Sequence, residues 1–356
     1  MADHRARISL FTRLTADYTG GMTAFFHHRL LNDALHDPVL EVRLHRRNRI
    51  LLFDAGTLTR LTPRNLLHVT DLFISHTHMD HFMDFDRLLR ADLMSDKCIR
   101  VYGPAGFLAQ CTAKLHAYTW NVCENFLFGM EIHEVLPGLV RSRRLDAARG
   151  FAPVQEVRER SVPGAGTGMV ILEEPEFKVK ALIHDHGVPC LAFRIEQPQR
   201  LGVDAAALQR HGFATGEWLE ELRRLILAGA PGDTSVPVVG PGGVSHRRLD
   251  ALRDFVLDLG NGRSLGYCVD SSPSDDNLAR LTEFFNGIDV MYCEAAFAHA
   301  DLDHARWKHH LTATQAGELA RRTGAKKCIP CHISPRYEDA PERIIEETRA
   351  AFNGVS

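Results

Sequence analysis

The sequence predicts an α/β protein, built as one large domain or two average ones. Its 356 residues allow either arrangement, and 45% of them are hydrophobic, which is enough for a substantial core. Short apolar runs typical of buried strands alternate with longer segments whose apolar residues recur at helical spacing. Polar residues suited to chemistry follow several of the short runs, and α/β proteins build their sites at such strand ends.

The expected elements follow one another along most of the chain. Strands are expected at 49–54, 70–75, 98–103, 177–183, 190–196, 263–269, 289–293 and 327–331. Helices are expected at 84–95, at 204–228 with breaks at Gly212 and Gly216, at 312–323 and at 341–352. Thr312 or Thr314 is the expected N-cap of the third helix. The glycine- and proline-rich residues 229–243 are expected to form a mobile loop.

The charge balance and the lack of long apolar runs exclude several classes of protein. Lys and Arg number 42 and Asp and Glu 45, so the formal net charge is −3, which argues against a generally basic nucleic-acid binder. A local basic groove stays compatible with this balance. No apolar run reaches the ~18–20 residues of a membrane span, and the N-terminus lacks the apolar stretch of a secretory signal. We therefore expect a cytoplasmic location, no membrane partner and reduced thiols at the eight cysteines.

Histidine is the unusual residue of this chain, and its clustering indicates a metal site. Twenty histidines are present, and the run His76-Thr-His78-Met-Asp80-His81 places four potential ligands directly after an expected strand. In an extended chain, His76 and His78 point to the same side and can hold one ion. Asp80 and His81 then lie in a turn and can face a second ion. Imidazoles with a carboxylate suit zinc and related divalent metals, whereas the alternative is a solvated, histidine-rich turn.

The same run resembles the signature of the metallo-β-lactamase superfamily, and the details are most similar to its tRNase Z (ribonuclease Z) branch. The resemblance covers about residues 49–340, in matching order and approximate spacing. The matching segments are 52–57, 73–75, 88–90, 186–194, 267–271, 294–297, 310–312 and 332–337. This family removes 3′ trailers from precursor tRNA. The resemblance implies an αββα sandwich, in which two mixed β-sheets are flanked by helices.

The resemblance also implies two divalent metal ions. The implied ligands are His76, His78 and His186 for the first ion, Asp80, His81 and His332 for the second, and Asp270 as a bridge between both. A bridging carboxylate makes physical sense, because it offsets the charge between two dications about 3.5–4 Å apart. Zinc suits this histidine-rich set, with manganese as the alternative.

Several of these positions have rivals nearby in the sequence. His184 lies two residues before His186 and faces the same side if both lie in a strand. The pair Asp275-Asp276 is an alternative to Asp270, although it falls in a loop-like stretch. The last ligand ends the segment Cys328–His332, whose CxxCH spacing is also that of c-type haem attachment. With no export signal in view, its cysteines are instead expected to pack as small apolar side chains.

The family pattern further implies a catalytic acid pair and a general base. Glu294 would orient His310, and His310 would donate a proton to the leaving oxygen. Asp80 would take the proton of the metal-activated hydroxide that attacks the phosphodiester. His309 is the rival of His310, and Glu294 has the alternative of being an ordinary carboxylate at a strand end. The presence of this pair favours phosphodiester hydrolysis among the activities of the superfamily.

The expected organisation is one hydrolase domain with additions. Residues 1–48 are expected to pack on the core as an N-terminal segment, residues 49–340 to form the hydrolase domain, and residues 341–356 to form a C-terminal helix. An arm is expected at about 202–243, where the family carries the insert that grips the tRNA elbow. Nearby acidic residues offset its arginines, so packing on the core or on a second subunit is an equal alternative.

We therefore interpret the sequence as a two-metal phosphodiesterase that resembles tRNase Z and forms a homodimer. The expected partner is RNA, and the expected substrate is the 3′ end of precursor tRNA. One alternative is a metallohydrolase of small phosphodiesters, such as cyclic nucleotides, which the near-neutral arm favours. Another alternative is a catalytically idle, metal-binding assembly subunit.

Overall fold

The computed structural model describes residues 26–44, 48–198, 201–258 and 262–355. The chain forms two compact units. The larger comprises residues 1–173, 179–195 and 264–356, and the smaller comprises 174–178 and 196–263. The expectation for residues 1–48 lies mostly outside the described residues. Its described part, 26–44 with residue 48, contributes two strands for which the sequence carried no clear signal.

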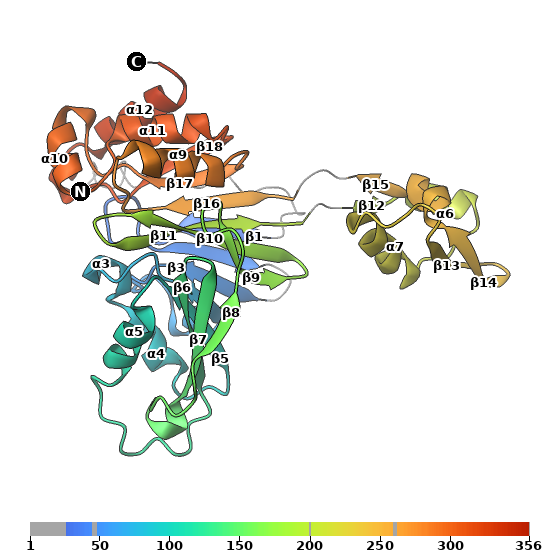
Figure 1. The fold of residues 1–356 in the computed structure, drawn as a ribbon, viewed down its shortest axis with the longest axis horizontal. Coiled ribbons are helices and arrows are strands. Elements are labelled where there is room, and N and C mark those ends of the chain that lie inside the picture. The colour runs from blue at the N-terminus through green and yellow to red at the C-terminus, as the bar shows by residue number, and fades with distance from the viewer. Residues whose placement is uncertain (1–25, 45–47, 199–200, 259–261, 356) are drawn as a thin grey trace. The chain divides into compact units, whose positions relative to one another are not determined.

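The first sheet of the larger unit has eight strands, arranged side by side in chain order (Figure 1). The strands are β1 (Phe26–Leu30), β2 (Leu40–Leu44), β3 (Arg49–Phe53), β4 (Val69–Phe73), β5 (Cys98–Gly103), β6 (Gly129–Leu136), β7 (Leu139–Asp146) and β8 (Arg158–Ser161). Strands β3 to β6 run parallel, whereas the strands outside them pair antiparallel. The carboxyl ends of the parallel strands therefore meet at one edge.

The second sheet has six strands in the order β18-β17-β16-β11-β10-β9. The strands are β9 (Met169–Glu174), β10 (Phe177–Asp185), β11 (Pro189–Glu196), β16 (Ser264–Cys268), β17 (Val290–Glu294) and β18 (Lys327–Cys331). Strands β16, β17 and β18 run parallel, so their carboxyl ends also lie together.

Aromatic side chains fill the space between the two sheets. Phe53 of β3 stacks on Phe73 of β4 at 4.7 Å between ring centroids. Phe193 of β11 and Tyr267 of β16 approach the Phe53 ring at 5.4 and 6.0 Å. These rings are fully buried and join the sheets face to face, as expected for the inner layers of a sandwich.

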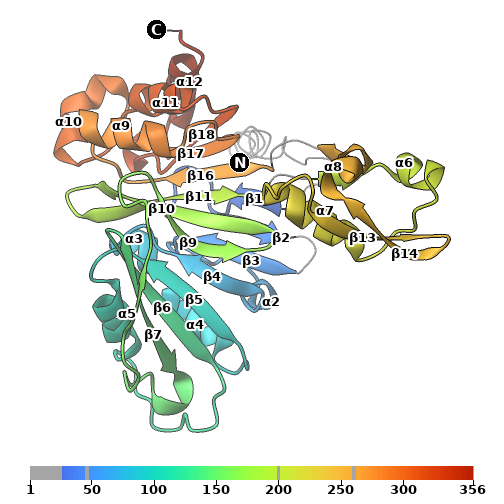
Figure 2. The same ribbon diagram turned by 45° about the vertical axis from the view of Figure 1, so that its right-hand side comes forward.

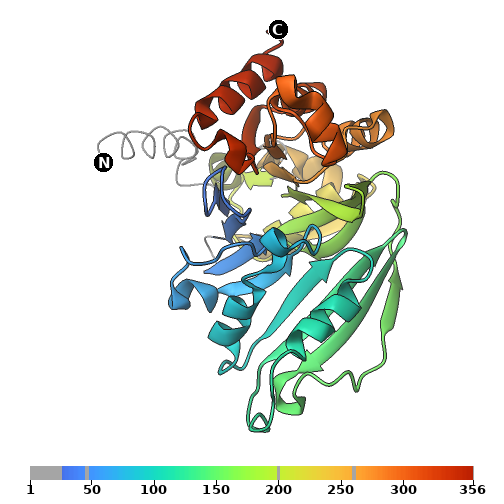
Figure 3. The same cartoon turned by 90° about the vertical axis from the view of Figure 1, so that its left-hand side faces the viewer.

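Helices cover the two outer faces (Figures 2 and 3). On the first sheet they are α2 (Pro63–Leu66), α3 (Met79–Phe82), α4 (Phe85–Asp92) and α5 (Phe107–Leu115). On the second they are α9 (Asp275–Phe284), α10 (Leu302–Trp307), α11 (Ala313–Arg322) and α12 (Pro341–Phe352). Short 3₁₀ turns occur at Ala147–Arg149, His299–Asp301 and Pro335–Tyr337. The predicted αββα sandwich is confirmed.

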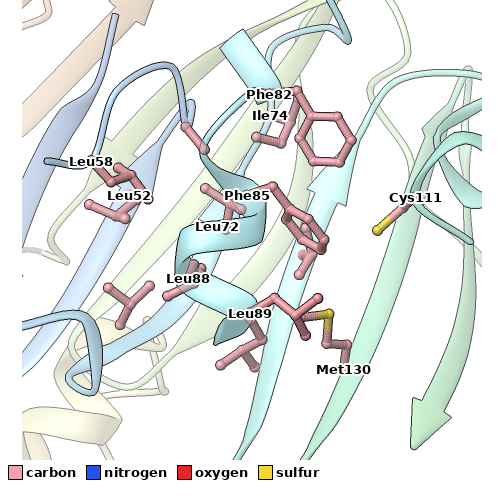
Figure 4. Packing of buried hydrophobic residues seen from close by; sticks show 14 of the residues in the cluster. Leu52, Leu58, Leu72, Ile74, Phe82, Phe85, Leu88, Leu89, Cys111 and Met130 are labelled. Carbon is pink, nitrogen blue, oxygen red and sulfur yellow. The ribbon is translucent and has the colours of Figure 1, made fainter. Parts of the chain in front are cut away.

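Helix α4 illustrates how the outer helices are held. Phe85, Leu88 and Leu89 have the i, i+3, i+4 spacing that places apolar side chains on one helix face. In Figure 4 these side chains pack against Leu52 and Leu72, which point outward from strands β3 and β4. Helix α11 begins at a capping box, in which the Thr312 side chain accepts from the backbone of the N3 residue and Gln315 returns the interaction.

The smaller unit has its own core. Its elements are β12 (Leu201–Val203), α6 (Ala205–Arg210), α7 (Trp218–Leu227), β13 (Ser235–Gly240), β14 (Gly243–Arg248), α8 (Leu249–Leu252), a 3₁₀ turn (Arg253–Phe255) and β15 (Val256–Asp258). Trp218, Leu222 and Val236 are among the residues buried together there. The unit contains the expected arm, 202–243, and extends beyond it at both ends.

The expectation of a loop at 229–243 is wrong for residues 235–240, whereas 229–234 are turn and coil. Residues 235–240 form strand β13, which pairs with β14 through a tight turn at Pro241-Gly242. Val236 and Val238 alternate with exposed neighbours and pack into the core of the smaller unit. The high glycine and proline content of the turn masked this short alternation. Among the described residues, no helix is long and apolar enough to cross a membrane.

Candidate metal centre

The candidate site forms where the parallel strands of both sheets end. The segment 76–81 follows β4 and leads into α3, and His186 follows β10. Asp270, Glu294 and His332 lie at the ends of β16, β17 and β18. This arrangement explains why residues distant in the sequence meet at one place.

Four of the predicted ligands form the first group. His76, His78, His186 and Asp270 each offer one ligand atom, and these atoms lie within 4.8 Å of one another. The rings of His76 and His78 are 4.3 Å apart, and those of His78 and His186 are 5.3 Å apart. Asp270 Oδ2 lies 3.3 Å from His76 Nε2 and 3.5 Å from His186 Nε2.

The remaining predicted ligands form a second group beside the first. Asp80, His81 and His332 bring their ligand atoms within 4.8 Å of one another. Asp80 Oδ2 lies 3.3 Å from His81 Nε2 and 3.2 Å from His332 Nε2. Asp270 reaches this group as well, because its Oδ2 lies 3.1 Å from His81 Nε2 and its Oδ1 lies 3.0 Å from His332 Nδ1. The Asp270 carboxylate therefore stands between the two groups.

The donor atoms of these groups fit divalent cations. His76 Nε2, His81 Nε2, His332 Nδ1 and Asp270 Oδ1 are buried, yet within the described residues none of them has a hydrogen-bond partner. Buried polar atoms in proteins are nearly always paired, so a cluster of unpaired nitrogen and oxygen atoms facing one another calls for ions between them. Imidazole and carboxylate donors are those that zinc and similar metals prefer.

The electrostatics of the cluster agree with this fit. Burial lowers the pKa of His76 to about 2, which keeps this imidazole neutral and able to coordinate. Burial opposes the charged form of His332 too, but Asp270 outweighs it and raises the pKa of His332 to about 10. Burial likewise favours neutral Asp270, but His332 and His81 hold its pKa well below the usual range. A divalent cation would displace protons from such imidazoles on binding.

Asp54 orients the second group, and no role was expected for it from the sequence pattern. Its side chain is fully buried and accepts from His81 Nδ1 at 2.9 Å, which leaves His81 Nε2 facing the cluster. It also accepts from the Ser75 backbone at 2.7 Å, the Ser75 hydroxyl at 2.9 Å and the Tyr267 hydroxyl at 2.9 Å. A carboxylate behind a ligating histidine fixes the ring and its tautomer. The available signal was an aspartate directly after a buried strand.

Glu294 and His310 form a pair at the edge of the cluster. His310 Nδ1 lies 2.7 Å from Glu294 Oε2, and Glu294 also accepts from the Ser271 backbone. Burial opposes protonation of His310, but the Glu294 carboxylate outweighs it and raises the pKa of His310. The His310 ring is 4.8 Å from that of His186, so the pair adjoins the first group.

The structure also places the rivals of these residues. His184 is buried beside the site, but it belongs to neither ligand group. His309 contributes its backbone oxygen, which accepts from His186 Nδ1 at 2.8 Å and orients that ring. Asp275 and Asp276 lie in the first turn of α9, outside both groups. Cys328 and Cys331 are free thiols on β18, and Cys331 is buried there.

The described sheets and helices form the metallo-β-lactamase fold, whose enzymes use a dinuclear metal site, and the two groups of His and Asp residues are candidate ligands for such a site. The fold resembles that of the metallo-β-lactamase fold protein YhfI from Bacillus subtilis, with a TM-score of 0.51 and 17% identity over 93% of this chain and 90% of that one. It also resembles human tRNase Z, short form, with a TM-score of 0.51 and 18% identity over 87% and 91% of the two chains.

Sequence comparison defines the family more closely. Ribonuclease Z of Deinococcus radiodurans is 33% identical over 304 residues, which cover 85% of this chain and 86% of the relative. Ribonuclease BN of Erwinia tasmaniensis is 28% identical and covers 86% of each chain. No family model matches the sequence. The chain belongs to the ribonuclease Z family, and it is accordingly a metal-dependent hydrolase with the phosphodiesterase activity of an endoribonuclease.

Proposed function

We propose that this protein removes 3′ trailers from precursor tRNA by hydrolysing one phosphodiester bond. The observation that carries the proposal is the Glu294–His310 pair, at 2.7 Å, beside the Asp270 carboxylate. Hydrolysis of an RNA phosphodiester leaves a poorly stabilised alkoxide, which needs a proton. An imidazole whose pKa is raised by a buried carboxylate is suited to supply that proton from Nε2.

The proposed ligands divide between two ions as the two groups suggest. His76, His78 and His186 would hold one, Asp80, His81 and His332 the other, and Asp270 would bridge them. Zinc is the proposed metal, because imidazoles dominate the set, and manganese is the alternative. When bound, such ions activate water and offset charge on the phosphate.

The residues of the chain supply the remaining parts of the reaction. Asp80 is half exposed, and the neighbouring His332 and His81 overcome its burial and hold its pKa below the usual range, so the carboxylate is ionised. We assign it the proton of the attacking water. Glu294 holds His310 with Nδ1 toward the carboxylate, which leaves Nε2 for the leaving oxygen. His309 fixes His186 through its backbone oxygen. We also propose a homodimer, on the basis of the family resemblance.

The test is single-turnover cleavage of a 3′-extended precursor tRNA by zinc- or manganese-loaded protein. The account predicts a cut next to the discriminator nucleotide, lost in Asp80→Ala. Intact RNA with wild-type protein would contradict the proposal. An Asp80→Ala variant indistinguishable from wild type in every hydrolytic assay would favour the idle assembly subunit. Light scattering of the full chain tests the homodimer, which a monomeric mass would contradict.

Hydrolysis of small phosphodiesters is the second candidate, and one feature of the smaller unit favours it. Four arginines of α6, α7 and β14 are near acidic side chains: Arg223 and Glu220 are 2.5 Å apart, Arg224 and Glu221 also 2.5 Å, Arg248 and Asp250 2.7 Å, and Arg210 and Asp204 3.9 Å. Nucleic-acid affinity comes largely from cations that contact phosphates, so paired arginines make a weaker clamp. Turnover of bis(p-nitrophenyl) phosphate and cyclic nucleotides, with precursor tRNA left intact, would select this candidate.

A further inference from the structure

Trp307 is an exposed tryptophan close to the metal centre. It is the last residue of α10, and its exposed fraction is 70%. The two other tryptophans of the chain, Trp120 and Trp218, are partly and fully buried. Tryptophan is largely buried in most proteins, and exposed tryptophans are enriched where a partner is bound.

The backbone fixes Trp307 near the proposed acid. His310 donates from its backbone to Ala305 at 2.9 Å, and His309 donates to Arg306 at 3.1 Å, so the turn after α10 is tied to the helix. Trp307 and His310 are three positions apart in the chain, which limits the distance between their Cα atoms to about 10 Å. The backbone of Trp307 is therefore close to that of the proposed acid.

Trp307 has a cation beside it, and apolar side chains are exposed next to two of the candidate ligands. Lys308 Nζ lies 4.6 Å from the centre of the Trp307 ring. Met79, 77% exposed, directly follows His78, and Val188 is exposed two residues after His186. Helices α3 and α10 lie at the same end of the sandwich (Figures 1 and 2). Aromatic platforms with neighbouring cations are how proteins bind single-stranded nucleic acid.

We propose that Trp307 stacks on an unpaired RNA base next to the scissile phosphate, and that Lys308 contacts the backbone phosphate of that nucleotide. The inference deepens the proposed function and rests on it for the identity of the substrate. It makes Trp307 a binding residue rather than a catalytic one. Single-stranded bases are recognised by stacking because every base presents a π-face.

Fluorescence gives a direct test that does not need cleavage. Trp307 dominates the exposed tryptophan surface, so a short single-stranded RNA added to the full-length, zinc-loaded protein should quench its emission. The quenching should vanish in Trp307→Phe, where the remaining emission comes from Trp120 and Trp218. Absence of quenching in the wild-type protein, or equal quenching in the variant, would overturn the inference.

Kinetics on precursor tRNA supply the second readout. Trp307→Ala should raise KM about 5- to 150-fold, the loss of one stacked base, with kcat within about twofold. Trp307→Phe should restore most of the affinity, because it keeps an aromatic ring. Tyr118→Ala is the matched control: Tyr118 is also exposed, at 47%, but it follows α5 and belongs to neither ligand group.

The outcomes separate this inference from the proposed function. Wild-type KM in Trp307→Ala would overturn the stacking role and leave tRNA processing standing. A wild-type protein that leaves precursor tRNA intact, yet loses RNA quenching on Trp307→Phe, would refute the substrate and support the platform. A Trp307→Ala variant that halves the mass of a dimer would overturn the inference, because the side chain would then belong to a subunit interface.

Discussion

Replacement of Asp54 by asparagine removes the charge that orients the second ligand group while keeping the size of the side chain. Asp54 is fully buried, and three of its contacts meet at Oδ2: His81 Nδ1, the Tyr267 hydroxyl and the Ser75 hydroxyl, each at 2.9 Å. The other oxygen accepts from the Ser75 backbone at 2.7 Å. An amide group must place its NH₂ against one of these two sets of donors, so either orientation loses at least one hydrogen bond.

The size of the effect follows from these contacts. A buried donor left without a partner costs about 1–3 kcal/mol, so the free energy of unfolding should fall by that amount. Loss of the carboxylate behind a ligating histidine weakens metal binding by about 10- to 100-fold. The loss should fall on one of the two ions, because His81 belongs to the second ligand group.

Zinc titration against a chromophoric chelator measures the affinity of each ion, and denaturant unfolding of the metal-free protein measures stability. Asp92→Asn is the matched control, since Asp92 is another fully buried aspartate but pairs with Lys97 at 2.7 Å, outside both ligand groups. It should leave both zinc affinities unchanged. Wild-type zinc affinities in Asp54→Asn would refute the orienting role.

Four further predictions follow from the same contacts. Glu294→Gln should lower the rate of RNA cleavage about 10²- to 10⁴-fold. It should also move the alkaline limb of the pH–rate profile to lower pH, because the Glu294 carboxylate raises the pKa of the His310 acid. An unmoved limb would contradict the role of Glu294 in holding the proton on His310. Burial raises the pKa of Asp92 to about 6. The stability that its protonated form contributes is present below about pH 4 and is lost as the pH rises through 6. Asp92→Asn should abolish this pH dependence in unfolding experiments, and an unchanged dependence would contradict the prediction. Gly56→Ala should lower the melting temperature and zinc affinity, because its Cβ would lie 2.2 Å from the backbone oxygen of Asp80; a wild-type melting temperature would disprove the clash. Chelation of the metal should lower the melting temperature. The stability lost should be about 3 kcal/mol if zinc was present beforehand at 100 times its dissociation constant. No shift in calorimetry would argue against bound metal.

The sequence predicted the parts of the fold that carry strong local patterns. The segment 98–103 is a strand with the predicted bounds, and Thr312 caps α11 as expected. Strand β1 gave no signal because His27, His28 and Arg29 leave apolar residues only at its ends, and the alternation in β2 spans only three apolar residues. Strands β6 to β8 were missed because charged and polar residues interrupt the apolar positions of β6 and β7, and β8 has no apolar residue.

The site was predictable as a set of residue types but not as a geometry. His76, His78, Asp80 and His81 follow one strand, so their proximity was visible in the sequence. The choice between His184 and His186 was not visible in the sequence, because both lie on the same side of one run. Only the turn that follows β10 places His186, and not His184, in a ligand group. The orienting partners were also hidden. Asp54 is 27 residues from His81, and His309 acts through a backbone atom that any residue would supply.

The most direct measurement compares His310→Ala with wild type on two substrates that differ in their leaving group. Bis(p-nitrophenyl) phosphate releases a phenolate that needs no proton, whereas precursor tRNA releases an alkoxide that does. The account predicts that the variant loses RNA cleavage by at least about 10²-fold and keeps hydrolysis of the small diester within a few fold. Equal losses on both substrates would contradict the central claim, because the Glu294–His310 pair would then support the metal centre rather than protonate the leaving group.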